Sequence, residues 1–93
     1  MYAIVVTVDI EADRADESVK LLEEFTIPAV KSEDGFVRGA WLRTNDKSNG
    51  RGVVLFDTEE QANAAARTAQ QGPPPGAPVT VRSVEVFEVV GQA

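Results

Sequence analysis

The chain of 93 residues contains no cysteine and no histidine. Without cysteine it can form no disulfide, no thiolate nucleophile and no cysteine-ligated zinc or iron–sulfur site. Without histidine it lacks the side chain that most often carries protons near neutral pH and most often ligates transition metals. We therefore expect no metal and no cofactor, and we expect a small core that a partner subunit, rather than a cross-link, helps to stabilise.

Basic residues are scarce as well. Nine lysines and arginines stand against fifteen acidic residues, which gives a net charge of −6. The basic residues form no stripe, which excludes a nucleic-acid-binding surface. No apolar run approaches the roughly 20 residues that span a bilayer, and the first residues lack the basic segment of a signal peptide. The sequence indicates one soluble, cytoplasmic domain over residues 1–93, with neither nucleic acid nor membrane as a partner.

Hydropathy patterns predict four strands and two helices. A helix is expected from an N-cap at Asp13 to about Lys31, kinked at Pro28. A capping box at residues 58–61 starts the second helix, whose inner stripe is alanine. The resulting β-α-β-β-α-β order predicts a ferredoxin-like α+β fold with a four-stranded antiparallel sheet. Both helices are expected on one face, and the first and third strands in the centre. The expected strands cover residues 2–10, 35–44, 51–57 and 79–90.

Several local features follow from the same patterns. In the first helix, Phe25 and Ala29 are expected to continue the apolar stripe of Ala15, Val19 and Leu22. Asn49 and Gly50 tolerate positive φ and predict the hairpin turn before the third strand. The last strand changes its alternation near residue 83, which predicts a β-bulge or burial on both faces. The proline-rich segment 72–78 predicts an extended connector.

Polar and aromatic side chains come together on the second strand. Trp41 and Arg43 are two residues apart and therefore share a face, while Arg38 lies on the opposite face with Phe36. A planar ligand could stack on the indole while the guanidinium binds a carboxylate or phenolate, with Asn45 close by. The alternative is that the tryptophan fills the core or an interface and the arginine covers the sheet edge. Both interpretations remain open at this point.

The acidic run at the end of the first strand is spaced like part of a calcium-binding loop. Arg14 stands where that loop needs glycine, and Lys20 stands where it needs the closing glutamate. We therefore interpret the run as a solvated helix start. It consists of Asp9, Glu11, Asp13 and Glu17.

Two short motifs and the order of the elements resemble a known family. The motifs are G-F-x-x-G at residues 35–39 and F-D-T-E-E-Q-A at residues 56–62. With them, the whole chain resembles the dimeric α/β-barrel superfamily, and within it the antibiotic biosynthesis monooxygenase-like domains. The resemblance implies a homodimer that forms an α/β barrel and a domain that binds a small aromatic or apolar ligand. We expect any such site between the sheet and the helices, with Trp41 or Arg43 at its edge. Such a scaffold hosts several functions, so the activity stays undefined.

The resemblance does not extend to the heme-degrading relatives. They carry an asparagine on the first strand, a tryptophan near the end of the third strand and a heme-ligating histidine on the second helix. The corresponding places here hold Val6 or Thr7, then Phe56, then a helix without histidine.

Quinone-forming relatives need no metal or flavin, because a phenolic substrate itself reacts with dioxygen. Trp41, Arg43 and Asn45 could stabilise its oxyanion, although the strand-three pair of those enzymes is not reproduced. No nucleophile–base pair is visible in the sequence. Two functions therefore stay open. One is a ligand-binding module, and the other is a cofactor-independent monooxygenase acting on a phenolic or quinone-type substrate.

The strands are apolar on both faces, which supports the homodimer independently. Two helices can cover only one face of a four-stranded sheet, and a second face in contact with water should be polar. Instead each strand offers apolar residues to both faces: Ile4 and Val5 on the first strand, Val37 and Leu42 on the second, and Val54 and Leu55 on the third. We expect two sheets to meet face to face and bury the uncovered side.

Overall fold

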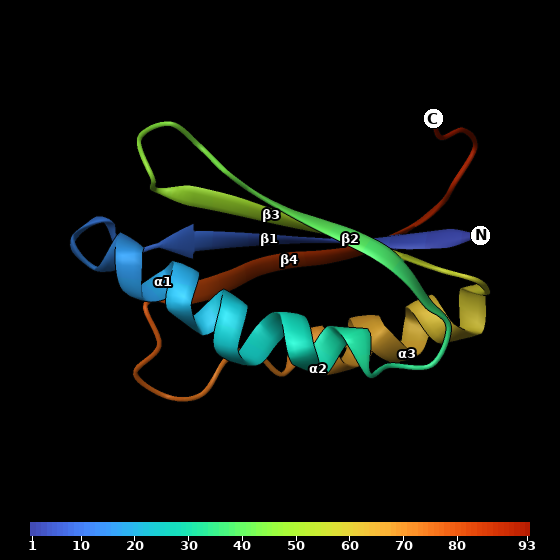
Figure 1. Ribbon diagram of the computed structural model, residues 1–93, viewed down its shortest axis with the longest axis horizontal. Helices are drawn as coiled ribbons and strands as arrows, with labels where there is room; N and C mark the ends of the chain where they lie inside the picture. Colours follow the sequence, from blue (N-terminus) through green and yellow to red (C-terminus); the bar gives the residue numbers. More distant parts are fainter.

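A computed structural model describes all 93 residues and places two helical segments against one face of a four-stranded antiparallel sheet (Figure 1). The sheet order is β2-β3-β1-β4, so the first and third strands are central. These findings confirm the predicted ferredoxin-like α+β fold. None of the helices is long and apolar enough to cross a membrane. The strands are β1 (Tyr2–Ile10), β2 (Phe36–Arg43), β3 (Asn49–Phe56) and β4 (Val79–Glu88).

The first helical segment is continuous but changes its winding three times. It runs through a 3₁₀ turn η1 (Ala12–Arg14), α1 (Ala15–Leu21), a π-helical turn η2 (Leu22–Thr26) and α2 (Ile27–Lys31). Asp13 lies inside η1 and caps nothing, so its predicted role as N-cap is wrong. The predicted continuation through Pro28 is confirmed. The wider π turn just before the proline relieves the clash that its ring would make with the preceding turn.

The predicted apolar stripe continues past the π turn. Phe25 and Ala29 line the space between the helices and the sheet together with Val19 and Leu22. Phe25 is nevertheless 54% exposed and Ala29 is exposed, whereas Val30 contacts the core.

The second helix, α3 (Glu59–Gln70), lies close to the sheet because its inner residues are alanines. Thr58 and Gln61 form the predicted capping box, with both reciprocal hydrogen bonds present. The alanines contact Ile4 of β1 and Val54 and Phe56 of β3, and the Phe56 side chain is fully buried. Small side chains let the backbones approach, which places the core between α3 and the central strands. The buried alanines are Ala62, Ala65 and Ala66.

A β-bulge near the start of β2 shifts its pairing with β3. Phe36 pairs with Phe56, and Arg38 then pairs with Leu55, so Val37 is the extra residue. Because one extra residue reverses the alternation, Phe36 faces the helices together with Trp41. The predicted placement of Phe36 on the face of Arg38 is therefore wrong, while the shared face of Trp41 and Arg43 agrees with their pairing opposite Gly52 and Gly50.

The turn between β2 and β3 lies before the predicted position. Asn49 and Gly50 already belong to β3, and Lys47 is the residue with positive φ, at 65°. The Asp46 carboxylate organises this loop by accepting hydrogen bonds from the hydroxyl of Thr44 and from the hydroxyl and amide of Ser48, at 2.7 to 3.0 Å. These bonds lower the pKa of Asp46 to about 2.

The predicted irregularity of β4 is confirmed as a bulge. Thr7 of β1 pairs with Ser83, and its neighbour Val8 pairs with Val81, which leaves Arg82 as the extra residue. Before β4, the proline-rich segment 72–78 is less extended than predicted. It contains a tight turn in which the amide of Ala77 donates to the carbonyl of Pro74, with Gly76 at a φ of 83°.

The face of the sheet turned away from the helices, the outer face, is apolar in its centre. Its Leu42 and Phe87 are 56% and 47% exposed. The chain end turns toward this side (Figure 1), where the Arg38 guanidinium donates to the side-chain oxygen of Gln92 at 2.7 Å. The register places seven apolar residues on it: Ala3, Val5, Ala40, Leu42, Val53, Leu55 and Phe87.

Candidate functional site

A cavity of about 510 Å³ lies between the sheet and the helices. Its walls come from all four strands, the first helical segment and α3, and most of its lining residues are hydrophobic. The volume falls within the range of roughly 300–1,000 Å³ that small-molecule sites occupy. The hydrophobic wall of β1 consists of Ile4, Val6, Val8 and Ile10.

Trp41 lies on the wall of this cavity, flat against the sheet. A Cβ atom added to Gly52 would be 2.9 Å from the indole nitrogen, and one added to Gly39 would be 2.9 Å from the far carbon of the ring. Both ends of the indole therefore rest on glycine backbone. One ring face is covered by the sheet, and the half-buried side chain lines the cavity.

Arg43 lines the same cavity, two residues along β2 from Trp41. Its guanidinium makes no ion pair and no hydrogen bond to another side chain or to the backbone, so its donors are free for a ligand. Asn45 is exposed in the loop after β2 and does not line the cavity. The structure therefore brings two of the three candidate residues together and leaves Asn45 outside.

Glu33 is a cavity residue that the sequence did not indicate. It follows α2, its amide is bound to the carbonyl of Val30, and its carboxylate forms no hydrogen bond or ion pair. Burial raises the pKa of Glu33. No motif surrounds this residue, and only the packing of the helix end against the sheet places it at the cavity.

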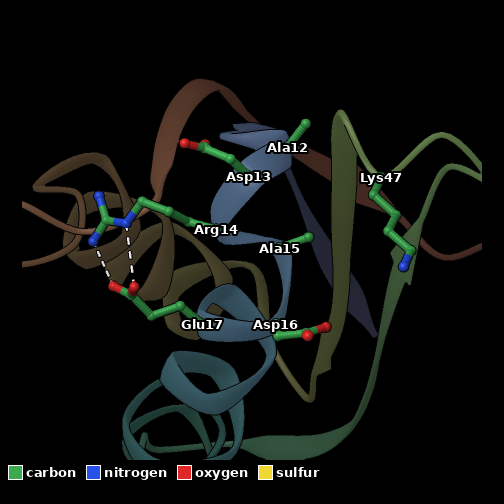
Figure 2. Close-up of a pocket in the computed structure, with 7 residues that line it drawn as sticks. All are labelled: Ala12, Asp13, Arg14, Ala15, Asp16, Glu17 and Lys47. Carbon is green, nitrogen blue, oxygen red and sulfur yellow. Dashed lines mark hydrogen bonds and ion pairs between the residues drawn. The ribbon is translucent and has the colours of Figure 1, made fainter.

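A second, polar hollow of about 360 Å³ lies at the start of the first helical segment (Figure 2). Arg14 crosses one side of it and pairs with Glu11 at 2.9 Å and with Glu17, which lowers the pKa of Glu17. Asp16 and Lys47 project from opposite sides of the hollow (Figure 2). No group of three or more acidic side chains is arranged to hold a metal ion.

Arg14 also connects this region to the proline-rich segment. Its guanidinium donates to the carbonyl of Gly76 at 2.8 Å, and the amide of Glu11 donates to the carbonyl of Pro78 at 2.9 Å. Pro73, in the same segment, lines the large cavity. The hydrogen bonds of Arg14 and Glu11 thus attach the proline-rich segment, which forms part of the cavity wall, to the first helical segment.

No protein-family model matches the chain, and no curated protein sequence matches it. Solved structures do share its fold. The heme-degrading protein MhuD of Mycobacterium tuberculosis, solved with two hemes bound in its active site, has a TM-score of 0.74 and 22% identity, over 100% of this chain and 99% of that chain. A dimeric ferredoxin-like protein from an uncultured marine organism has a TM-score of 0.71 and 12% identity, over 100% and 98%.

A monooxygenase of Streptomyces coelicolor, ActVA-Orf6, solved in complex with nanaomycin D, has a TM-score of 0.63 and 12% identity, over 99% of this chain and 89% of that chain. At these identities the likeness shows the fold alone. It confirms the predicted scaffold, which is the ferredoxin-like fold found among antibiotic biosynthesis monooxygenase-like proteins.

Proposed function

We propose that the protein binds a small planar aromatic ligand in the cavity between sheet and helices, with Trp41 and Arg43 as its contacts. The observation that carries the proposal is that Trp41 and Arg43, two residues apart on one face of β2, both line an apolar cavity of about 510 Å³. The Arg43 side chain is exposed and has no partner within the protein. An apolar pocket with a few polar groups is the usual form of a small-molecule site.

The two residues supply different parts of the binding energy. The exposed face of Trp41 offers a stacking surface, worth about 0.5–1.5 kcal/mol beyond the area it buries. Arg43 offers paired N–H donors that match a carboxylate or a phenolate. The expected ligand is therefore an aromatic acid or an acidic phenol. A heme fits the donor set poorly, because the chain has no histidine to ligate its iron.

Titration with 2-naphthoic acid tests the proposal directly, because Trp41 is the only tryptophan and its fluorescence reports on the cavity. We expect saturable quenching, and we expect Arg43→Gln to weaken binding about tenfold, as for the loss of one charged hydrogen bond. Arg38→Gln is the matched control, since Arg38 lies on the outer face of the same strand. Equal effects of the two substitutions would contradict a role of Arg43 in the site.

A second candidate function is a cofactor-independent monooxygenase acting on a phenolic substrate. It is favoured by the position of Arg43, whose charge would stabilise the phenolate from which an electron passes to dioxygen. In the overall reaction a phenol and one O₂ give a quinone and one water. One oxygen atom enters the ring as the new carbonyl, and the other leaves as water.

Oxygen consumption separates the two candidates. With 1-naphthol as substrate, a monooxygenase would take up one O₂ for each quinone formed, and Arg43→Gln would lower the rate while Arg38→Gln would not. A binding module would bind naphthols and naphthoic acids without any uptake above the rate in buffer.

We also propose that the protein is a homodimer that joins the outer faces of two sheets. The support is the apolar surface of this face. Val5, Val53 and Leu55 lie on its two central strands, and Leu42 and Phe87, on the two edge strands, are 56% and 47% exposed. Soluble monomers rarely expose apolar patches larger than a few hundred Å², and two-fold pairing would bury this one. The ferredoxin-like protein with a TM-score of 0.71 is itself described as dimeric, which supports a homodimer on this fold.

Analytical ultracentrifugation tests the dimer. We expect the protein to sediment at twice its mass of 10.0 kDa, and Leu42→Glu to shift it toward the monomer because a charge would be buried at the interface. Ala64→Glu, on the exposed side of α3, is the control and should remain dimeric. A monomer at micromolar concentration would overturn the proposal.

A further inference from the structure

We propose that Glu33 recognises a hydroxyl group of the ligand at the opposite end of the cavity from Arg43. The ligand class is then an aromatic body with an acid group at one end and a phenolic hydroxyl at the other. This inference rests on the proposed function and extends it, because it assigns a second recognition residue and fixes which way the ligand lies.

The positions of the two residues along the sheet set their separation. The carbonyl of Glu33 accepts a hydrogen bond from the amide of Phe36, the first residue of β2, whereas Arg43 is the last residue of that strand. On the neighbouring strand β3, Phe56 pairs with Phe36 and Gly50 pairs with Arg43. These two positions mark two levels along the sheet that are six residues apart. At about 3.3 Å per residue the two levels are about 20 Å apart. Both residues line the cavity, and side chains directed into it from these levels would leave room for a fused ring system along the indole of Trp41.

The carboxylate of Glu33 is available for a ligand. It has no ion pair and no hydrogen bond, and the side chains that line the cavity near it include Val30 and Phe56. Its nearest charged neighbours in sequence, Lys31 and Asp34, are exposed and do not line the cavity. A carboxylate in this setting accepts a hydrogen bond from a hydroxyl strongly, because the bond is charge-assisted.

Glu33 is also unfavourable where it stands, which argues against a purely structural role. It lies just beyond the C-terminal end of the helical segment, where the helix dipole disfavours a negative charge. Partial burial adds a second cost to the charged form. A residue that carries two costs and makes no compensating contact within the protein is typical of a binding site.

Three naphthalene probes test the inference by calorimetry. They are 6-hydroxy-2-naphthoic acid, which carries both groups, 2-naphthoic acid, which lacks the hydroxyl, and 2-naphthol, which lacks the acid. We expect the first to bind about tenfold more tightly than either of the others. Glu33→Leu should remove the advantage of the hydroxyl and leave 2-naphthoic acid within about twofold. Glu33→Gln, which keeps an acceptor oxygen, should restore part of the advantage.

Glu24→Gln is the control, since Glu24 is exposed in the same helical segment. If the two acids bind equally to the unaltered protein, or if Glu33→Leu weakens both to the same extent, the role of Glu33 is refuted while the aromatic site stands. If none of the three probes binds, the proposed function fails as well.

Discussion

The indole of Trp41 rests on Gly52, its cross-strand partner in β3, so closely that a Cβ atom on that glycine would lie 2.9 Å from the ring nitrogen. Gly39, two residues before Trp41 on β2, supports the other end of the ring, where an added Cβ atom would also lie 2.9 Å from the nearest ring atom. Neither glycine needs its backbone freedom here, because neither has a positive φ. Their role is the absence of a side chain, which lets the tryptophan lie flat and keeps the cavity open above it.

Gly52→Ala should displace the indole into the cavity. The new methyl group would come closer to the ring than side-chain atoms tolerate, and overpacking of this kind costs on the order of 1–3 kcal/mol. We expect a shift in Trp41 emission and several-fold weaker binding of 2-naphthoic acid. Gly91→Ala, at a position with no atom within 4 Å of the new carbon, should change neither quantity.

Ala66→Leu should destabilise the protein by about 1–3 kcal/mol, because Ala66 is 6% exposed and α3 has no space for a larger residue against the sheet. Ala64→Leu is the matched control on the exposed side of the same helix. Chemical denaturation of both variants gives the comparison. Equal stability of the two variants would show that α3 can move away from the sheet without cost.

Glu33→Gln should stabilise the free protein at neutral pH. Burial raises the pKa of Glu33 above its ordinary value of 4.5, so its contribution to stability is present below that pH and is lost as the pH rises through the folded-state pKa. The amide of the variant does not ionise, so the variant does not lose this stability as the pH rises. Its advantage in thermal unfolding should therefore be absent near pH 4 and present at pH 7, whereas a constant difference would point to a cause other than ionisation.

Asp46→Ala should show the opposite dependence on pH. The pKa of Asp46 is lowered from 3.8 to about 2 by hydrogen bonds within the loop between β2 and β3. Its stabilising effect is therefore present above pH 3.8 and disappears as the pH falls toward 2. We expect the variant to melt below the unaltered protein at pH 7 and to match it near pH 2. Asp34→Ala, at an exposed position whose side chain makes no hydrogen bond, is the control.

The sequence predicted the fold well where a local signal matched the packing. The capping box at Thr58 and the change of alternation near Ser83 both have physical causes within a few residues, and both are confirmed. The failures arise where one residue too many enters a regular element. Neither the bulge at Val37 nor the π turn at Leu22–Thr26 leaves a mark in the hydropathy pattern, and the bulge changes which face of the sheet Phe36 lies on.

In the candidate site, too, local patterns placed some residues correctly and could not place others. Trp41 and Arg43 lie beyond the bulge and two residues apart, so their shared face could be read from the sequence. Asn45 could not be placed, because the direction of a loop depends on hydrogen bonds such as those to Asp46. Glu33 lies at the cavity because the end of the first helical segment packs against the sheet. This is a contact between segments far apart in the sequence, and no local sequence pattern predicts it.

The π turn at Leu22–Thr26 sets the rotation of α2 about the helix axis relative to α1. An α-helix advances by about 100° per residue, whereas a π turn accommodates one extra residue without advancing the helix. Deleting Glu23 or Glu24 would therefore restore regular winding and leave the helix after it facing as it does now. If the same five residues wound as a regular α-helix instead, everything after them would turn by about 100°, which would carry Val30 away from the core and Glu33 away from the cavity. For this protein the winding of one turn, more than the identity of its residues, determines what the cavity contains.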